Sequence, residues 1–458
     1  MTPHFNNLQK IFFIGIAGSG MSALAQYLQD LGKSISGSDR YFLPDTKNEI
    51  KEKLEAEGII CYPQNGDGIA SHIDLIVVST AIEDSVFEVQ KAKQLGIPII
   101  KRSELLAQIV ASKKTIAIGG TSGKSTVSAM LFTILEYAQL QPSIINGAGL
   151  VSLQQTGKIG NTKVGKGEWL IIEADESDGS ITQYKSEIGV LLNIEKDHKE
   201  VEELLSIFQI FKNNCQHFIV NQSHSLTRNL SKNSKQDFSI NEKDSGCLLA
   251  KKFIQIGSFI EFEVDKVSFR MNVIGKHNLE NAMAAIAAAV LVGVELEICA
   301  TALKNYEGIY RRHQILGTKN GVCVIDDFAH NPVKCAASIT ACQPIAPKVI
   351  AWFQPHGYTP TKFLRNDFVE EIAKVLRSQD EIWMSEIFYA GGTATKNISS
   401  RNLINDLKLK NSNAFFVENR EDFLDAVRPS LNDNCVLLLM GARDPSLENF
   451  AKKVFCDL

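Results

Sequence analysis

The chain has 458 residues, of which 44% are hydrophobic and 22% are charged, the balance of a globular protein with about three domains. Its formal net charge of −4 argues against a nucleic-acid partner and against an anionic membrane surface. Nine cysteines are scattered singly without a CxxC pair, so we expect no zinc cluster or disulfide framework, and a reducing cytosol. We expect a cytoplasmic protein without a membrane span, because the most apolar run, 282–296, is too short to cross a bilayer.

The first hundred residues predict a small α/β unit. An apolar strand, 10–14, leads through a glycine turn into a helical pattern and then into a second strand that ends at Ser38 and Asp39. The turn carries Gly15, Gly18 and Gly20 in the order GxxGxG, which is weak evidence for a dinucleotide site. Asp39 lies where a ribose-binding acid would fall, although by itself a turn aspartate after a strand is the simpler explanation. Another strand, 75–78, ends at Ser79, and strand ends of this kind bind ligands.

A phosphate-binding loop is predicted at 119–126, GGTSGKST, between an apolar strand and a helical pattern. Its glycines allow backbone N–H groups to converge on an anion at a helix start. Lys124 can reach a terminal phosphate, and Ser125 can place its hydroxyl on Mg²⁺. The strict first glycine of the motif is absent, because Ile118 stands five residues before Gly123. The alternative is a tight glycine turn without a ligand.

Two further strand ends in the central part carry polar groups. The strand 169–172 leads into the carboxylates of EADESD, 173–178, for which Mg²⁺ is a natural partner and a solvated acidic loop the alternative. A strand at 188–192 leads to His198, which is equally consistent with a structural histidine. An alanine-rich helix follows at 274–289, with His277, Asn278 and Asn281 at its start, where helix capping is the alternative function.

The last third predicts a doubly wound sheet, because short apolar strands alternate with helical segments. Strands at 322–325 and 348–353 lead to Asp327 and His330 and to His356, and paired arginines at 311 and 312 suit phosphate charge. The whole chain is therefore predicted as α/β with three domains: 1–108, 109–312 and 313–458.

Six motifs occur together in one order: GGTSGKST, EADESD, NIEKDH (193–198), GKHNLENAMAA (275–285), GIYRR (308–312) and DDFAHNP (326–332). In this combination the chain resembles the Mur ligases, the ATP-dependent amide-forming enzymes of peptidoglycan synthesis. The resemblance implies a Rossmann-like N-terminal domain that binds a UDP-sugar and a central P-loop ATPase-like domain. It implies a C-terminal Rossmann-like domain that binds the incoming amino acid and closes over ATP. ATP and Mg²⁺ are the implied cofactors, and a monomer or homodimer is expected.

The resemblance also implies roles for individual residues. Lys124, His198 and Arg312 would be catalytic, and the metal ligands would be Ser125, Glu173 and His198. The ATP-binding residues would be Gly120, Thr121, Ser122, Gly123, Lys124, Ser125, Thr126, His277, Asn278, Asn281, Arg312 and Asp327. The UDP-sugar would lie against Gly15, Gly18, Gly20, Ser38, Asp39 and Ser79. The acceptor pocket would contain His330 and His356.

Within the family, IFFIGIAGSGMSALA (11–25) and FQPHGYT (353–359) are most similar to the branch that joins L-alanine to UDP-N-acetylmuramate. That branch typically has a sequence similar to HRYTRT where this chain has HGYTPT (356–361). Gly357 and Pro360 therefore replace two arginines that are expected near the carboxylate of the amino acid. A relocated cation is one hypothesis, with the nearest candidates Lys334, Lys362 and Arg365. Two alternatives stay open: a paralogue with a different amine or peptide acceptor, and a nucleotide-binding protein that has lost ligase activity.

Overall fold

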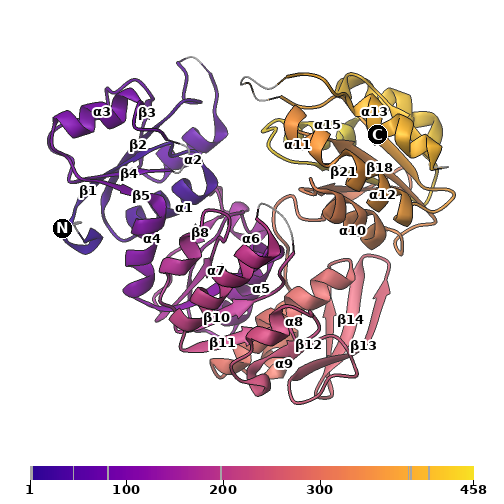
Figure 1. The fold of residues 1–458 in the computed structure, drawn as a ribbon, viewed down its shortest axis with the longest axis horizontal. Coiled ribbons are helices and arrows are strands. Elements are labelled where there is room, and N and C mark those ends of the chain that lie inside the picture. Colours follow the sequence, from indigo (N-terminus) through magenta and orange to yellow (C-terminus); the bar gives the residue numbers. More distant parts are fainter. Residues whose placement is uncertain are drawn as a thin grey trace. The chain divides into compact units, whose positions relative to one another are not determined.

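The computed structural model describes residues 4–44, 46–79, 82–195, 199–389, 391, 395–410 and 413–458. The chain divides into two compact units, which are described separately. The first comprises Met1–Lys252, Phe262–Phe269 and Leu279–Ile309, and the second comprises Phe253–Glu261, Arg270–Asn278 and Tyr310–Leu458. Figure 1 colours the elements along the chain, from the N-terminal strands in indigo to the C-terminal ones in orange and yellow. The two boundaries between the three predicted domains stay a prediction; residue 108 lies inside a helix, α4 (Arg102–Ala111).

The N-terminal sheet has five parallel strands in the order β3-β2-β1-β4-β5. This order is that of a doubly wound sheet, and it confirms the predicted βαβ start. The carboxyl ends of β1 and β4 are therefore neighbours. The elements are β1 (Lys10–Ile14), α1 (Ser19–Asp30), β2 (Ser34–Asp39), α2 (Glu49–Ala56), β3 (Ile60–Pro63), β4 (Leu75–Val78), α3 (Phe87–Gln94), β5 (Ile99–Lys101) and α4 (Arg102–Ala111).

The central sheet has six strands in the order β11-β10-β6-β9-β7-β8, all parallel except the β7–β8 pair. The strand before the phosphate loop, β6, lies between β9 and β10, so all three predicted strand ends meet at one edge. The elements are β6 (Lys114–Gly119), α5 (Lys124–Tyr137), β7 (Ser143–Ile145), α6 (Val151–Gln154), β8 (Thr162–Lys163), β9 (Trp169–Glu173), β10 (Ile188–Leu191), α7 (Val201–Asn214) and β11 (His217–Val220).

A third sheet, which the sequence did not predict, has the order β12-β13-β14-β15. Burial varies from residue to residue along these strands, and Lys251, Lys252 and Gln255 interrupt β13, so no long continuous apolar run marks them. The elements are β12 (Phe238–Ser239), β13 (Leu248–Ile256), β14 (Phe259–Val264), β15 (Val267–Met271), α8 (Lys276–Leu291) and α9 (Leu296–Lys304). Helix α8 is the predicted alanine-rich helix, and its alanines from 282 to 289 are all buried.

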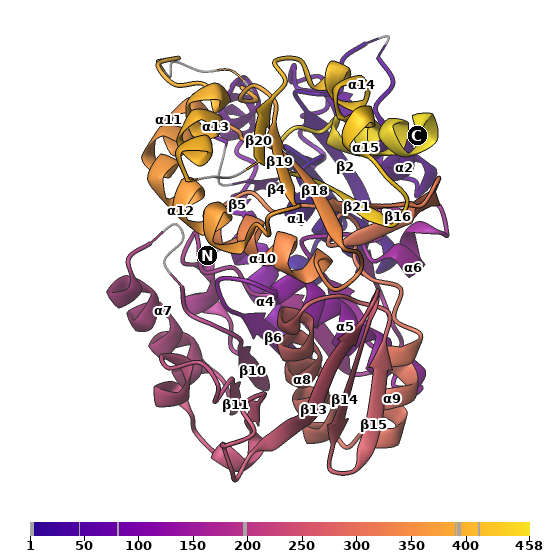
Figure 2. The same cartoon turned by 90° about the vertical axis from the view of Figure 1, so that its right-hand side faces the viewer.

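The C-terminal sheet has the order β16-β17-β21-β18-β19-β20, and all neighbours are parallel except β16 with β17. Helices α12 and α13 lie on one side of β18 and β21, and α14 and α15 lie on the other (Figure 2). The elements are β16 (Gln314–Lys319), β17 (Val322–Asp327), α10 (Pro332–Cys342), β18 (Lys348–Gln354), α11 (Tyr358–Phe363), α12 (Arg365–Val375), β19 (Glu381–Met384), α13 (Ser400–Leu409), β20 (Asn413–Phe416), α14 (Phe423–Val427), β21 (Cys435–Gly441) and α15 (Leu447–Asp457).

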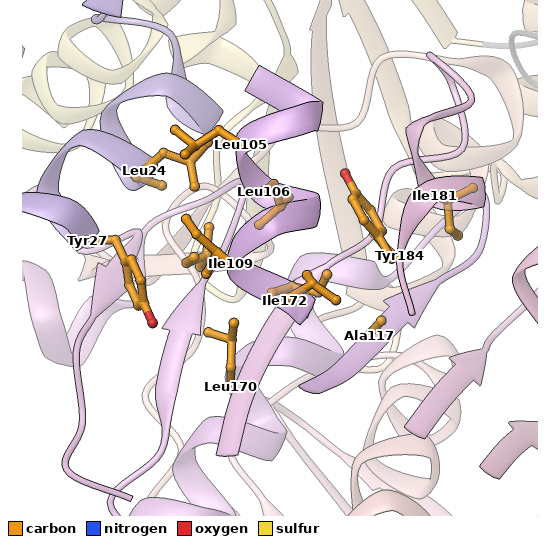
Figure 3. Packing of buried hydrophobic residues seen from close by; sticks show 14 of the residues in the cluster. Leu24, Tyr27, Leu105, Leu106, Ile109, Ala117, Leu170, Ile172, Ile181 and Tyr184 are labelled. Atoms are coloured by element: carbon orange, nitrogen blue, oxygen red, sulfur yellow. The ribbon is translucent and has the colours of Figure 1, made fainter. Parts of the chain in front are cut away.

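The first unit is held together by one apolar cluster that includes both of its parallel sheets. Figure 3 shows α4 at its centre: Leu105 faces Leu24 of α1, and Ile109 lies toward Leu170 of the central sheet. Leu24, Leu105, Ile109 and Leu170 are completely buried. Complete burial of a side chain of this size contributes about 1.5–3 kcal/mol. Helix α4 therefore fixes the N-terminal sheet against the phosphate-loop sheet.

The helices and the cysteines bear on two expectations from the composition. In the part of the chain that the structure describes, no helix is both long and apolar enough to cross a membrane. All nine cysteines are free thiols, and only Cys456 is exposed. Burial raises the pKa of several of these thiols, for example that of Cys215 to about 12.

Candidate active site

The phosphate loop connects β6 to α5, and its backbone depends on glycine at two positions. Gly120 has φ +137° and Gly123 has φ +87°, both in the region that side chains rarely adopt. A Cβ atom on Gly123 would also lie 2.4 Å from the amide oxygen of Asn281, on α8. Helix α5 begins at Lys124, so the free N–H groups of its first turn face the loop. The local geometry is that of an anion site, with Asn281 beside it.

Lys124 is nearly buried and forms an ion pair with Glu176, with 2.7 Å between Nζ and Oε2. Its ammonium also donates to the carbonyl oxygen of Gly120, at 2.8 Å. Burial opposes the charged form of Lys124, but the carboxylates of Glu176, Glu173 and Asp175 outweigh it and raise the pKa. The lysine is therefore protonated at neutral pH, and Glu176 is its counter-ion in this structure.

The hydroxyl of Ser125 donates to Oε2 of Glu173 at 2.7 Å, and the backbone N–H of Gly147 donates to the same oxygen at 2.8 Å. A hydroxyl and a carboxylate are oxygen ligands of the kind that Mg²⁺ prefers. Mg²⁺ sites on enzymes usually combine one or two carboxylates with water and substrate phosphate, so this pair fits such a site. Among the described residues, no group of three or more histidine, cysteine or acidic side chains could hold a metal, so phosphate and water would have to supply the other ligands. His198, the other predicted ligand, lies outside the described residues.

Asn193, two residues beyond the end of β10, fixes the loop from the other side. Its Oδ1 accepts hydrogen bonds from the Thr121 hydroxyl and the Ser122 backbone N–H, both at 2.9 Å. Its amide nitrogen donates to the Ser122 carbonyl oxygen at 3.1 Å. In the sequence, Asn193 is visible only as the first residue of the NIEKDH motif. Its amide supplies a donor and an acceptor at once, which explains why an asparagine fits here.

The predicted UDP-sugar residues meet at the carboxyl edge of the N-terminal sheet. Asp39 accepts from the backbone N–H of Ala17 at 2.9 Å, so its carboxylate orders the glycine turn. Ser38 is buried, and its hydroxyl donates to Glu88 at 2.6 Å. Burial raises the pKa of Glu88, a group that the sequence analysis missed. The remaining predicted residues lie in or beside the turn: Gly15 in it, Gly18 and Gly20 at the start of α1, and Ser79 opposite Gly15.

In the second unit, the buried carboxylate of Asp327 accepts from the backbone N–H of His313 at 3.0 Å. The ring centroid of His313 lies 5.0 Å from that of His277, with the two rings tilted, and its Nε2 lies 2.9 Å from the Ser338 hydroxyl. Burial and the neighbouring His313 lower the pKa of His277 to about 3. Burial alone would raise the pKa of Asp327, but His313 and Arg312 outweigh it and lower that pKa. Three predicted ATP-side residues, His277, Arg312 and Asp327, are thus neighbours.

The two arginines after α9 have different surroundings. Arg311 is buried and pairs with Asp326, at 2.9 Å between Nε and Oδ2, and its Nη2 donates to the carbonyl oxygen of Gly441. Arg312 is partly exposed, and its guanidinium stacks 4.7 Å from the ring of Phe328. Arg311 is therefore structural here, and Arg312 presents the accessible charge. Asn278 also has a structural contact, a 2.8 Å hydrogen bond to the carbonyl oxygen of Ile274.

The predicted acceptor residues are also neighbours, with 5.7 Å between the ring centroids of His330 and His356. Burial lowers the pKa of each imidazole to about 4, so both are neutral at pH 7. Among the proposed replacement cations, Arg365 is engaged in a bidentate pair with Asp406 at 2.7 and 3.0 Å. Lys362 is exposed on α11.

Three family models match the chain in order. They are the Mur ligase family catalytic domain over residues 10–114, the Mur ligase middle domain over 118–289 and the Mur ligase glutamate ligase domain over 311–443. A UDP-N-acetylmuramate–L-alanine ligase from Carboxydothermus hydrogenoformans is 34% identical over 454 residues, covering 94% of this chain and 93% of the relative. The chain belongs to the Mur ligase family.

Other relatives agree with this assignment. A UDP-N-acetylmuramate–L-alanine ligase from Agathobacter rectalis is 34% identical to this Mur ligase, with 96% of each chain covered. The solved UDP-N-acetylmuramate–alanine ligase of Thermotoga maritima has the same fold, with a TM-score of 0.81, 24% identity and 98% of each chain covered. A murein peptide ligase from Psychrobacter arcticus also shares the fold over 98% of each chain, with a TM-score of 0.66 and 19% identity.

The predicted site residues of this Mur ligase fall into separate groups. Lys124, Ser125 and Glu173 meet in the first unit, at an edge that Asn281 of α8 also shares. Thr126 follows Ser125 in α5, and its contact with ATP stays a prediction. Glu88, Asn193 and Gly147 support these groups but were missed as partners, because no motif signals a contact between distant strand ends.

Proposed function

We propose that this Mur ligase joins L-alanine to the carboxylate of UDP-N-acetylmuramate, using ATP and releasing ADP and phosphate. Mur ligases are ATP-dependent ligases, and the relatives with 34% identity carry this activity in their names. In the proposed reaction, ATP phosphorylates the sugar carboxylate and the amine then displaces phosphate from the acyl phosphate. The observation that carries the proposal is the loop in which Lys124, Ser125 and Glu173 lie together at a helix start.

The chain's own groups suit the first step. Phosphoryl transfer needs position and charge neutralisation more than covalent help. The backbone N–H groups of 120–124 and the ammonium of Lys124 would hold the terminal phosphates of ATP. Lys124 would exchange Glu176 for phosphate when ATP binds. Arg312 keeps its predicted role as a phosphate-binding arginine.

The residues present also fit Mg²⁺. We place it at Ser125 and Glu173, with His198 as a further ligand. When bound, the ion would neutralise phosphate charge. The backbone N–H of Gly147 donates to the Glu173 carboxylate and keeps it oriented. Glycine is needed at 147, because a Cβ atom there would lie 2.5 Å from that carboxylate.

The second step requires an uncharged amine. His330 and His356 are neutral at pH 7, so either imidazole can accept a hydrogen bond from the incoming ammonium group. A pKa of about 4 makes each a weaker base than the amine, so the proton itself would pass to solvent. A second candidate function keeps the chemistry but uses a different amine, because Gly357 and Pro360 supply no charge for an amino-acid carboxylate.

The test is phosphate release by the purified protein with ATP, Mg²⁺ and UDP-N-acetylmuramate, with and without an amine. We expect release that depends on L-alanine, and a product whose mass equals that of the sugar plus alanine minus water. Glycine, L-serine and short peptides should be compared at equal concentrations. Faster turnover with one of these would support the second candidate, and no amine-dependent release would contradict the ligase assignment.

A further inference from the structure

Three neighbouring strands of the C-terminal sheet end beside one another, and each is followed by a residue with a ring or a charge. In the sheet, β21 lies between β17 and β18, with Met440 opposite Asp327 and Gly441 opposite Gln354. His330 comes three residues after β17. His356 and Arg443 each come two residues after the register pair of β18 and β21. The arginine therefore follows the central strand, between the two strands that lead to the histidines.

The chain diverges at this edge. After β18 it continues into α12, whose apolar side chains pack on one face of the sheet. After β21 it continues into α15, which packs on the opposite face (Figure 2). Adjacent parallel strands whose following helices lie on opposite faces leave a crevice at their carboxyl ends, and α/β proteins bind ligands there. His356 and Arg443 are at this position.

Arg443 has two unusual properties. Its backbone is in the left-handed region, at φ +63°, which is unfavourable for a residue with a side chain. Strain of this kind persists where surrounding structure imposes it and is concentrated at functional sites. Its guanidinium is exposed, and within the described parts of the chain no carboxylate pairs with it. Other arginines of the second unit are paired: Arg311 with Asp326, Arg365 with Asp406 and Arg420 with Asp444.

His356 supplies a second observation. Its Nδ1 atom is buried, yet it has no hydrogen-bond partner among the described residues. Buried polar atoms are nearly always paired, so such an atom at a crevice indicates a ligand contact. The charge of Arg443 acts on this ring, since burial and then Arg443 lower the pKa of His356. The cation and the unpaired ring nitrogen therefore follow adjacent parallel strands at one sheet edge, each two residues after the same register pair.

We propose that Arg443 binds the carboxylate of the incoming amino acid in this Mur ligase, in place of cations at positions 357 and 360. This assignment rests on the proposed function, and it makes the acceptor an amino acid with a free carboxylate rather than an amide or a simple amine. A guanidinium can bind a carboxylate through two parallel hydrogen bonds. Bound in this way, the acceptor would place its amine toward the imidazoles of His330 and His356.

The decisive variant is Arg443→Gly. Glycine adopts φ +63° without strain, so the fold should be retained, which a thermal unfolding midpoint no lower than that of the wild type would verify. We expect the KM for L-alanine to rise by about ten- to a hundredfold, the value of one charge-assisted contact. The KM values for ATP and UDP-N-acetylmuramate and the kcat at saturating L-alanine should change less than about twofold. Arg401→Gln, at an exposed arginine on α13, is the matched control and should leave all constants unchanged.

L-Alaninamide provides a second measurement, because it has the same amine but no carboxylate. The wild type should prefer L-alanine over the amide by about ten- to a hundredfold, and Arg443→Gly should abolish this preference. An unchanged KM for L-alanine in Arg443→Gly, or a larger increase in Lys362→Gln, would contradict the assignment while leaving the proposed function intact. Absence of amine-dependent turnover in the wild type would contradict the proposed function and the assignment together.

Discussion

The phosphate loop and the carboxyl edge of the C-terminal sheet differ in how their polar groups are satisfied. In the loop, Lys124 pairs with Glu176, and Ser125 pairs with Glu173. At the other edge, Arg443 has no ion-pair partner among the described residues, and the Nδ1 of His356 is unpaired there. A ligand must therefore exchange existing interactions in the first region, whereas it adds new ones in the second. The first region is better suited to a highly charged ligand that can displace a buried ion pair.

The largest expected effect comes from removing the cation of the phosphate loop. Lys124→Ala should lower kcat by at least about a hundredfold, because it withdraws charge from the transferring phosphoryl group. Binding of UDP-N-acetylmuramate, measured by calorimetry, should be unchanged. Lys114→Ala is the matched control, since that lysine is exposed at the start of the same β6 strand. Near-normal turnover in Lys124→Ala would show that the loop does not bind the reacting phosphate.

The next effect concerns the metal. Glu173→Gln should raise the Mg²⁺ concentration for half-maximal activity by about tenfold, because an amide binds a hard cation more weakly than a carboxylate. The control is Glu168→Gln, at an exposed residue just before β9. His198→Ala is expected to act in the same direction. An unchanged metal dependence in both site variants would contradict a metal shared by Glu173 and His198.

The smallest expected effect is on the free energy of unfolding, and it comes from the buried His277 of the second unit. His277 has a pKa of about 3 in the fold, against an ordinary value of 6.5, so the unfolded chain binds one more proton between these values. Stability should therefore fall as pH decreases through this window. His277→Gln should reduce that pH dependence by about 1.4 kcal/mol per pH unit, measured as unfolding free energy. His72→Gln, at an exposed position, should leave the slope unchanged, and an identical slope in His277→Gln would contradict the burial argument.

Sequence reasoning predicted the parallel sheets well, because their strands are buried on both faces and form continuous apolar runs, as in β6 and β21. It missed the sheet of β12–β15, along whose strands burial varies from residue to residue. The phosphate loop was recognisable because its residues are adjacent in the chain. Arg443 was not recognisable from the sequence, because its place beside the strand that leads to His356 depends on the insertion of β21 between β17 and β18. Arg365 was a reasonable candidate by distance along the chain, but Asp406 already neutralises it.

The ion pair of the phosphate loop also links ATP to protons. Burial raises the pKa of Glu176, and Lys124 offsets part of that increase. When Lys124 turns from Glu176 to a phosphate, this offset is lost and the carboxyl group gains affinity for a proton. Nucleotide binding should then take up a fraction of a proton from the solvent. Calorimetric titrations with ATP in buffers of different ionisation enthalpy would measure this proton uptake. Identical apparent binding enthalpies in all buffers would show that Glu176 stays ionised.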